Sequence, residues 1–356
     1  MILQDRINAF AQLGDFLSQF TRASIEKKEG IAHNDLFFDG FKHQMKLAKE
    51  HNGWFTQENV LFAIEGWAQT LTKSNIETWL SVYGDAFAKA YEKPKTVAII
   101  MAGNIPLVGF HDFMCVLISG HSVVVKQSSN DKHLLPFLAK YLEYCAPELK
   151  GKISFTEDKL TTYDAVIATG SDNTARYFEY YFGKKPNIIR KNRNSVAVLT
   201  GKESEEELKG LSEDIFRYFG LGCRNVSKLF VPKGYNFDAF FKAMYHWSDL
   251  MNISKYANNY DYNKAVYLMS LFDMLENGFM MIKEDKSFSS PIATIFYEYY
   301  DTEDDVLQTL NDAKENIQCI VSHLKEAEHI KFGHTQKPGL SDYADGVDTI
   351  TFLATI

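Results

Sequence analysis

The sequence predicts an α/β protein with two domains, the first built around a largely parallel, doubly wound sheet. From residue 97 onward, short apolar runs alternate with segments of helical periodicity. Strands separated by single helices require right-handed crossovers, which place the strands in parallel. The chain has 356 residues, of which 46% are hydrophobic. At roughly 150 residues per domain, that length favours two domains with ordinary globular cores.

The first 92 residues are expected to be helical. Apolar residues between Leu3 and Phe20 recur at helical spacing with polar residues between them. Further helices are expected over 35–51, 56–71 and 74–91. The last of these opens with Ser74 and Glu77 at the spacing of a capping box. Pro94 then ends the helical section.

The next part of the chain alternates between strands and helices. Apolar runs indicate strands over 97–101, 123–126, 153–155, 165–168, 187–190 and 196–199. Segments of helical periodicity lie between several of these strands, over 106–119, 131–145 and 171–183. This alternation is typical of a doubly wound fold.

A second set of α/β elements follows Gly201. A helix over 204–219 opens with Ser204 and Glu207, again at capping-box spacing. The pattern then predicts strands over 229–232, 278–283, 292–299 and 317–321, with a candidate edge strand over 347–354. The range 237–275 is expected to be mostly helical, and a further helix is expected over 303–315. We therefore divide the chain into a domain over 1–200, a second domain over 201–330 and a C-terminal segment over 331–356. That segment either returns to the first domain or contributes to a dimer interface.

Composition and charge exclude several classes of protein. The net charge is -8 and no basic stripe is present, so nucleic acid and anionic membranes are not expected partners. No uninterrupted apolar run exceeds six residues, and the N-terminus lacks a signal-peptide core, so we expect no membrane span. The four cysteines are too scattered for a disulfide framework or a metal site. We expect a reduced, cytoplasmic protein without a bound metal.

Cys223 differs from the other cysteines in its surroundings. It lies in the stretch Gly220-Leu-Gly-Cys-Arg-Asn, where glycines allow the backbone to approach a ligand closely. The neighbouring Arg224 would favour the thiolate, which is the nucleophilic form. The alternative is a cysteine in a tight turn between a helix and a strand, and the local sequence favours neither interpretation. The other three cysteines are interpreted as core residues.

Three further motifs follow predicted strands. Asn104 lies between the first strand and a helix, Lys126 ends the second strand, and Thr169, Gly170 and Ser171 connect a third to a helix. Ligands bind at the carboxyl ends of parallel strands, an asparagine amide can stabilise an oxyanion, and a helix N-terminus suits a phosphate. Each motif also has a structural alternative: a helix cap, a lysine at a strand exit, or a glycine turn with a serine N-cap. Their shared position at one sheet edge favours a functional site. The GxGxxG, GxxxxGK[ST], HExxH and GxSxG fingerprints are missing.

In this order, the motifs resemble those of the aldehyde dehydrogenase superfamily. The matching stretches are Ala102-Gly-Asn-Ile-Pro (oxyanion asparagine), Val125-Lys126-Gln-Ser (cofactor lysine), Ala168-Thr-Gly-Ser (cofactor phosphate turn) and Gly220-Leu-Gly-Cys-Arg (nucleophile loop). Further stretches resemble one branch, the acyl-CoA reductase family of the LuxC type: Gly103-Asn-Ile-Pro with His111-Asp112, Arg190-Lys-Asn-Arg-Asn-Ser-Val-Ala-Val-Leu and Gly339-Leu-Ser-Asp-Tyr-Ala-Asp-Gly-Val-Asp. The resemblance extends from about residue 95 to the C-terminus.

This resemblance implies an aldehyde-dehydrogenase-like fold, with the cofactor domain in 1–200 and the catalytic domain in 201–330. It implies that an acyl-CoA, of fatty-acyl type, is reduced to the aldehyde by NADPH through a Cys223 thioacyl-enzyme. Asn104 would stabilise the oxyanion. The residues expected to bind the cofactor are Lys126, Ser128, Thr169, Gly170 and Ser171.

Departures from the wider superfamily bear on the direction of the reaction and on the cofactor. Aldehyde-oxidising members carry a glutamate base after the cofactor turn, whereas 183–202 contains no carboxylate. That absence favours thioester reduction. Ser129 stands three residues after Lys126, where NAD-preferring relatives often place a glutamate. Serine there favours NADPH, with Ser128 as a contact of its 2′-phosphate and NADH as the alternative. Near 289–291, no glutamate matches the one that positions the nicotinamide ribose.

Two other functions remain open. One is a different oxidoreductase on the same scaffold, acting in aldehyde oxidation or acyl-phosphate reduction. The other is a non-catalytic subunit that binds a nucleotide or an acyl group. The donor is acyl-CoA or another activated acyl group, supplied free or by a partner enzyme. The resemblance also implies a homo-oligomer, most simply a dimer. His111 could relay a proton, although a packed helix histidine is the preferred interpretation.

Overall fold

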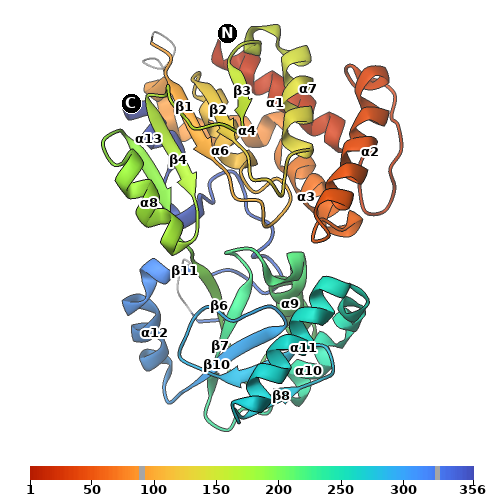
Figure 1. The fold of residues 1–356 in the computed structure, drawn as a ribbon, viewed down its shortest axis with the longest axis vertical. Coiled ribbons are helices and arrows are strands. Elements are labelled where there is room, and N and C mark those ends of the chain that lie inside the picture. The colour runs from red at the N-terminus through yellow and green to blue at the C-terminus, as the bar shows by residue number, and fades with distance from the viewer. Residues whose placement is uncertain (88–92, 325–328) are drawn as a thin grey trace. The chain divides into compact units, whose positions relative to one another are not determined.

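The chain divides into two compact units, each with its own sheet. The computed structural model describes residues 1–87, 93–324 and 329–356. The first unit comprises Met1–Lys191 and Gly339–Ile356, and the second comprises Asn192–Pro338. The first contains a five-stranded parallel sheet and the second a six-stranded mixed sheet (Figure 1). The predicted α/β class is therefore confirmed. The division follows Lys191, whereas the sequence analysis placed the domain boundary near residue 200.

The first unit begins with helices that share one apolar core. They are α1 (Leu3–Leu17), α2 (Asn34–His51), α3 (Gln57–Thr70), α4 (Lys73–Leu80) and the 3-10 segment η1 (Ser81–Phe87). The prediction for the last helix was wrong at both ends. Thr72 caps α4 by accepting a hydrogen bond from the Asn75 backbone N–H at 3.2 Å, so Ser74 lies inside the helix and forms no capping box. The α-helix ends at Leu80, and residues 88–91 of the predicted range lie outside the described residues.

The sheet of the first unit is parallel throughout and doubly wound. Its strands are β1 (Thr96–Ile100), β2 (Ser122–Lys126), β3 (Ile153–Thr156), β4 (Ala165–Thr169) and β5 (Asn187–Arg190). Their order in the sheet is β3-β2-β1-β4-β5. The chain thus moves outward from β1 to β3 and then returns to the other side of β1. The point where the order reverses lies between β1 and β4, which is where doubly wound sheets bind ligands.

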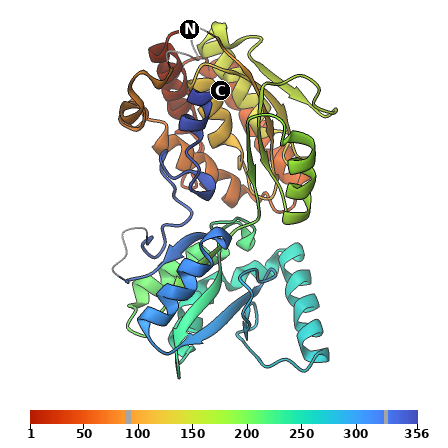
Figure 2. The ribbon, with the colours of Figure 1, turned by 90° about the vertical axis from the view of Figure 1, so that its left-hand side faces the viewer.

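Helices cover both faces of this sheet because alternate strand residues point to opposite sides. The helices are α6 (Phe110–Ile118), α7 (Leu134–Cys145) with the 3-10 turn η2 (Pro147–Leu149), and α8 (Asp172–Phe182). Val97 and Ile99 of β1 pack into the core that includes α6, α7 and the N-terminal helices. Ala98 faces the opposite side, where Phe178 of α8 packs. Figure 2 shows the sheet with helices on both of its faces.

Two elements of the first unit differ from the sequence-based expectation. Helix α6 begins at Phe110, not at residue 106, because Leu107 adopts a positive φ of 57° that no helix continues. The candidate edge strand over 347–354 is wrong: residues Thr349–Thr355 form helix α13, which follows the 3-10 turn η6 (Ala344–Gly346). Its β-branched residues suggested a strand, but the buried pair Ile350 and Leu353 is spaced for a helix.

The second unit surrounds a six-stranded sheet of order β11-β6-β7-β10-β9-β8. The strands are β6 (Asn194–Val198), β7 (Val226–Pro232), β8 (Met274–Glu276), β9 (Met281–Glu284), β10 (Thr294–Tyr300) and β11 (Ile317–Val321). The helices are α9 (Glu205–Phe216) with η3 (Arg217–Gly220), α10 (Asp238–Met244) with η4 (Tyr245–Asn252), α11 (Ser254–Met269) and α12 (Glu303–Asp312) with η5 (Lys314–Asn316). The capping box of Ser204 and Glu207 is present, as predicted. The region expected to be helical to residue 275 instead continues into β8.

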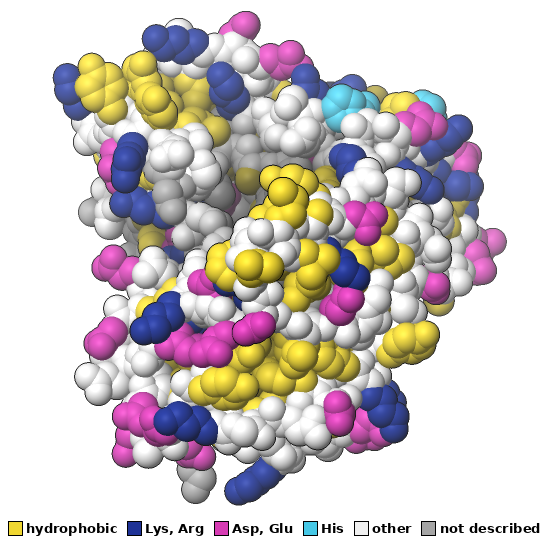
Figure 3. Space-filling model, turned by 60° about the horizontal axis from the view of Figure 1, so that its bottom comes forward, with side chains coloured by type: hydrophobic (Ala, Val, Ile, Leu, Met, Phe, Trp, Pro, Cys, Tyr) yellow, Lys and Arg dark blue, Asp and Glu magenta, His cyan; other side chains and the backbone are white. Residues whose placement is uncertain are grey.

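Exposed apolar side chains gather where α11 ends and the chain turns into β8. They are Leu268, Met269, Leu271, Phe272 and Leu275. Figure 3 shows hydrophobic side chains at the surface of this end of the second unit. No helix in the described part of the chain is long and apolar enough to cross a bilayer.

Candidate active site

The strand-end motifs of the first unit emerge side by side at one edge of the sheet. Ile100 of β1 pairs with Lys126 of β2 on one side and with Ala168 of β4 on the other. The segments that follow these three strands therefore start at the same carboxyl edge. Asn104 lies in the segment after β1, Lys126 is the last residue of β2, and the turn over 169–171 begins at the last residue of β4. The sequence analysis expected all three motifs at this edge.

The segments after β1 and β2 are in close contact. A Cβ atom on Gly103 would lie 2.5 Å from the Ser128 Oγ, so only glycine fits beside this serine. The Ser128 Oγ accepts a hydrogen bond from the backbone N–H of Asn130 at 3.2 Å. The backbone N–H of Met101 donates to the carbonyl of Lys126 at 3.1 Å. These contacts hold Lys126 and Ser128 on a fixed loop beside the Asn104 segment.

Asp131 connects the same two segments, and the sequence analysis did not identify it. Its Oδ2 accepts the backbone N–H of Leu107 at 3.1 Å, which fixes the residue with the positive φ. Burial raises the pKa of Asp131 to about 6. Ionising a buried carboxyl group costs free energy. The hydrogen bond from the Leu107 backbone offsets part of that cost and links the segment after β1 to the segment after β2.

Asn104 does not cap the helix that follows it. It is half-buried in the segment between β1 and α6. The N-cap position of α6 is occupied by Gly109, five residues later. The structural alternative for Asn104 is thus wrong, and its role as an oxyanion donor stays a prediction.

The turn from β4 into α8 has the features of a phosphate-binding turn. The Ser171 Oγ caps α8 by accepting the Thr174 backbone N–H at 3.4 Å. A Cβ atom on Gly170 would lie 2.9 Å from the side chains of Thr174 and Phe178, so only glycine lets the helix approach this closely. The positive end of the α8 dipole therefore lies at the carboxyl edge of the sheet. Together, this turn, Lys126 and the glycine-lined Asn104 segment fit a nucleotide cofactor.

Among the four cysteines, Cys223 is the exposed one. Cys115 and Cys319 are buried and Cys145 is half-buried. Burial raises the pKa of the Cys115 thiol well above its ordinary value and that of Cys145 to about 11, which keeps both protonated. These surroundings agree with the interpretation of the three as core residues.

The loop that carries Cys223 is held from below by Asn225, which sequence reasoning missed. The side chain of this buried residue donates to three carbonyls at the end of α9: Asp214 at 3.1 Å, Ile215 at 3.2 Å and Arg217 at 2.7 Å. Its Oδ1 accepts the backbone N–H of Gly222 at 2.8 Å. The Ser195 hydroxyl donates to the carbonyl of Cys223 itself at 2.9 Å. The backbone on both sides of the nucleophile candidate is therefore fixed.

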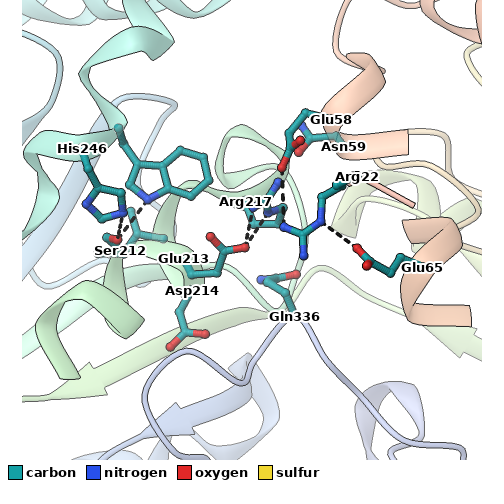
Figure 4. A network of polar contacts seen from close by, with 12 residues as sticks. Arg22, Glu58, Asn59, Glu65, Ser212, Glu213, Asp214, Arg217, His246 and Gln336 are labelled. Atoms are coloured by element: carbon teal, nitrogen blue, oxygen red, sulfur yellow. Dashed lines mark hydrogen bonds and ion pairs between the residues drawn. The ribbon is translucent and has the colours of Figure 1, made fainter. Parts of the chain in front are cut away.

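The chain enters this loop through strained residues. Tyr218 and Phe219 have positive φ values of 55° and 60°, and Gly220 follows at 75°. For residues with a Cβ atom this conformation costs about 1–2 kcal/mol each. The neighbouring Glu213 forms an ion pair with Arg217 at 2.6 Å and steadies the end of α9 (Figure 4). Strain of this kind persists where the surroundings enforce it, and it clusters at functional sites.

Arg224 forms hydrogen bonds with Cys319 of β11 and with the loop residue Thr335. Its Nη1 donates to the carbonyl of Thr335 at 3.3 Å and to the Sγ of Cys319 at 3.5 Å. The charge of Arg224, which the sequence analysis expected to favour the Cys223 thiolate, therefore also lies beside the Thr335 carbonyl and the Cys319 sulfur.

The stretches that resemble the LuxC branch meet in the first unit. Arg190, at the end of β5, forms a buried ion pair with Asp112 of α6 and donates to Thr349 of α13 at 3.2 Å. The Nε2 of His111 donates to the carbonyl of Leu340 at 3.0 Å, and its ring packs among Trp67, Trp79 and Tyr343. His111 is accordingly a packed helix histidine. These stretches join α6, β5 and the C-terminal segment.

One family model and one curated protein match this sequence. A family model described as acyl-CoA reductase (LuxC) matches residues 47–244, which is more than half of the chain. The long-chain acyl-protein thioester reductase of Aliivibrio fischeri is 24% identical over an alignment of 233 residues. The match covers 59% of this chain and 47% of that protein. The chain thus spans about half the length of this curated relative.

Solved aldehyde dehydrogenases share the fold. Aldehyde dehydrogenase 21 of Physcomitrella patens, in complex with succinate, has a TM-score of 0.64 at 12% identity, covering 92% of this chain and 74% of its own. The indole-3-acetaldehyde dehydrogenase AldA of P. syringae, in complex with NAD+, has a TM-score of 0.62 at 14% identity, covering 88% and 70%. At this identity the similarity concerns the fold, which is aldehyde-dehydrogenase-like as the motifs implied.

Proposed function

This chain belongs to the acyl-CoA reductase (LuxC) family, and from that membership we propose that it reduces an acyl-CoA thioester to the aldehyde with NADPH. The observation that carries the proposal is the loop of Cys223. It presents an exposed thiol on a backbone that Asn225 and Ser195 fix from both sides. A nucleophile on such a loop can attack without a further loss of backbone conformational entropy.

In the proposed reaction, the Cys223 thiolate attacks the carbonyl carbon of the acyl thioester. The resemblance of their motifs to those of aldehyde dehydrogenases makes the side-chain amide of Asn104 and the backbone N–H of Cys223 the proposed donors to the oxygen that becomes negatively charged. One such donor typically contributes about 3 kcal/mol of transition-state stabilisation. The bond from carbon to the CoA sulfur then breaks, and CoA leaves as a thiolate, so a thioacyl-enzyme remains.

The cofactor site of the proposal is the carboxyl edge of the first sheet. Lys126 and Ser128 contact the adenosine part, and the turn over 169–171 with the N-terminus of α8 binds the phosphates. NADPH, when bound, supplies the hydride that converts the thioacyl carbon to the aldehyde oxidation level. Cys223 then leaves the carbon as a thiolate and the aldehyde is free. Serine rather than a carboxylate at 129 supports NADPH over NADH, since a glutamate there would repel a 2′-phosphate.

The absence of a carboxylate between 183 and 202 supports the reductive direction. An oxidising enzyme needs a base that activates water to hydrolyse the thioacyl-enzyme. Without one, the thioacyl-enzyme persists long enough for reduction. The acyl donor is proposed to be acyl-CoA. The curated relative is named for an acyl-protein thioester, which is the alternative donor.

The test combines cofactor consumption with detection of the acyl-enzyme. We expect the purified protein to oxidise NADPH only when an acyl-CoA is present, and Cys223→Ala to reduce this rate to background. Cys145→Ala, at a half-buried cysteine in the first unit, is the control and should retain activity. Without NADPH, mass spectrometry should find the acyl group on Cys223. Cys223→Ala with wild-type activity would refute the proposal, and an acyl-enzyme that never consumes NADPH or NADH would favour the non-catalytic alternative.

A further inference from the structure

The loop over 332–336 lies directly against α9, the helix that leads to Cys223. A Cβ atom on Gly210 of α9 would lie 3.0 Å from the carbonyl carbon of Phe332 and 3.1 Å from the backbone nitrogen of Gly333. Gly333 itself has a positive φ of 81°, a conformation that glycine adopts without strain. Glycine at both positions therefore lets the backbone of the loop contact the backbone of the helix.

Asp214 of α9 holds this loop with a fully buried carboxylate. Its Oδ2 accepts the backbone N–H of Gly333 at 2.7 Å, and its Oδ1 accepts the backbone N–H of Thr335 at 2.9 Å and the Thr335 hydroxyl at 2.8 Å. These three groups are all donors, which suits an ionised carboxylate because it only accepts. An asparagine in this place would offer one acceptor oxygen, and its NH2 group would face the N–H of Gly333.

Hydrogen bonds connect Asp214 to the residues on both sides of Cys223. The carbonyl of Thr335, whose N–H and hydroxyl the carboxylate accepts, itself accepts the Nη1 of Arg224 at 3.3 Å. The backbone carbonyl of Asp214 accepts the side-chain amide of Asn225 at 3.1 Å, and Asn225 in turn holds the backbone N–H of the residue before Cys223. Asp214 thus fixes the nucleophile loop twice, once through its carboxylate and once through its carbonyl.

Resting on the proposed reaction, we propose that Asp214 is a positioning residue for the nucleophile. It keeps the backbone of Cys223 in the place from which the thiolate attacks and from which the Cys223 N–H donates to the oxyanion. Asp214 itself neither contacts the substrate nor exchanges a proton in the reaction. Small displacements of a reacting group slow the chemical step strongly. Loss of Asp214 should therefore lower kcat and leave unchanged the KM for NADPH, whose proposed site is in the first unit.

The first measurement is kcat and KM of the full-length protein with an acyl-CoA and NADPH. Asp214→Asn should lower kcat by about tenfold, the effect of losing one hydrogen bond to a charged group. Thr335→Val removes only the hydroxyl donor and should lower kcat by less, whereas Thr335→Ser retains that donor and should match the wild type. Asp249→Asn, at an exposed aspartate of η4 in the same unit, is the matched control and should retain the wild-type kcat.

The second measurement is hydrogen–deuterium exchange of peptides that contain residues 219–225, which reports the order of the nucleophile loop without any turnover. Exchange should be about tenfold faster in Asp214→Asn than in the wild type, and faster by a smaller factor in Thr335→Val. Thr335→Ser and Asp249→Asn should exchange like the wild type. The two Thr335 variants carry the same test if Asp214→Asn does not fold.

The outcomes separate this inference from the proposed function. Unchanged exchange in Asp214→Asn and Thr335→Val would overturn the inference, while turnover by the wild type would still support the reductase. Faster exchange with an unchanged kcat would show that catalysis does not depend on this order, and would also overturn the inference. A wild type that turns over no acyl-CoA, with NADPH or NADH, would overturn the proposed function and with it the catalytic role of Asp214, whereas faster exchange in the variants would still show that Asp214 orders the loop.

Discussion

At the scale of single residues, Asn225 shows how one side chain can organise a reactive loop. An asparagine amide has two donor hydrogens and an acceptor oxygen, and here they serve the end of α9 and the backbone of Gly222 at once. The free carbonyls at a helix end need partners, and Asn225 supplies them from the residue two places after Cys223. The helix end and the nucleophile loop are consequently fixed by the same group.

Asp131 gives a prediction of how stability depends on pH. Its pKa is raised to about 6 in the folded protein by burial, against about 3.9 in the unfolded chain. The folded state therefore binds more protons between these values, and stability is lost as the pH rises from about 4 through 6. Asp131→Asn removes this loss, so its stability relative to the wild type should increase by about 2 kcal/mol between pH 4 and pH 7.5.

Urea unfolding at the two pH values is the measurement. The control is Asp158→Asn, at an exposed aspartate in the loop after β3, which should leave the pH dependence as it is in the wild type. If Asp131→Asn and the wild type lose stability in parallel over this range, the ionisation of Asp131 is not responsible.

At the scale of elements, the C-terminal helix is joined to α4, η1 and the loop before β2 by polar contacts. Trp79 donates to the hydroxyl of Tyr343 at 2.9 Å, and the Tyr343 and Tyr83 hydroxyls lie 2.6 Å apart. Tyr83 in turn donates to Asp348, the N-cap of α13, at 3.0 Å. His121 donates to the carbonyl of Leu353 at the other end of that helix. Both ends of α13 are thus fixed.

The buried ion pair between Arg190 and Asp112 belongs to the same junction and yields a prediction. Both side chains are less than a tenth exposed, at 6% and 7%. Asp112→Asn leaves the guanidinium of Arg190 without a charge partner, which should cost about 3–5 kcal/mol of unfolding free energy. The double variant Asp112→Leu with Arg190→Met removes both charges and should recover most of that loss.

Chemical denaturation of the wild type, Asp112→Leu, Arg190→Met and the double variant closes a thermodynamic cycle. A double variant as unstable as the worse single variant would show that packing, not an uncompensated charge, is what the mutations disturb. A single variant within about 1 kcal/mol of the wild type would mean that water reaches the pair.

Local sequence identified the strands and the candidate residues that follow them, because strand ends in a doubly wound sheet are positioned by the fold class itself. It could not identify residues whose importance comes from distant partners. Asn225 reads locally as a turn residue, and Asp131 as a loop carboxylate. The predicted strand over 229–232 begins after Lys228, yet β7 begins at Val226. This lysine is fully buried and paired with Glu298 at 2.6 Å.

Contacts that the local sequence does not reveal also explain why the predicted edge strand over 347–354 is instead helix α13. The stretch from Val347 to Thr355 is rich in β-branched residues, which favour strands locally. In the structure, burial of Ile350 and Leu353 and the cap by Asp348 outweigh that preference. The expected homo-oligomer, for which this stretch was a candidate edge strand, stays a prediction without that strand.

At the scale of the whole molecule, the division into units predicts how fragments behave. The second unit is one continuous segment, whereas the first needs residues from both ends of the chain. A fragment of residues 192–338 should fold cooperatively alone. A fragment of residues 1–191 should be much less stable, since it lacks the apolar side chains of Ile350 and Leu353 that complete its core.

Circular dichroism and urea unfolding of three fragments test this: 192–338, 1–191, and 1–191 joined to 339–356 by a flexible Gly/Ser linker of about ten residues. The joined fragment should regain most of the stability that 1–191 lacks. Equal stability of the two versions of the first unit would contradict the role given to α13, and a non-cooperative 192–338 would contradict the independence of the second unit.

The return of the chain to the first unit also orders events during synthesis on the ribosome. Residues 1–191 emerge first but cannot close their core, because α13 has not yet been made. The second unit is one continuous segment, so all of its residues are available once residue 338 has been made. A nascent chain of this protein therefore has all residues of its second unit before it has all residues of its first, and the surface of α6 that α13 contacts stays uncovered until residues 339–356 have left the exit tunnel.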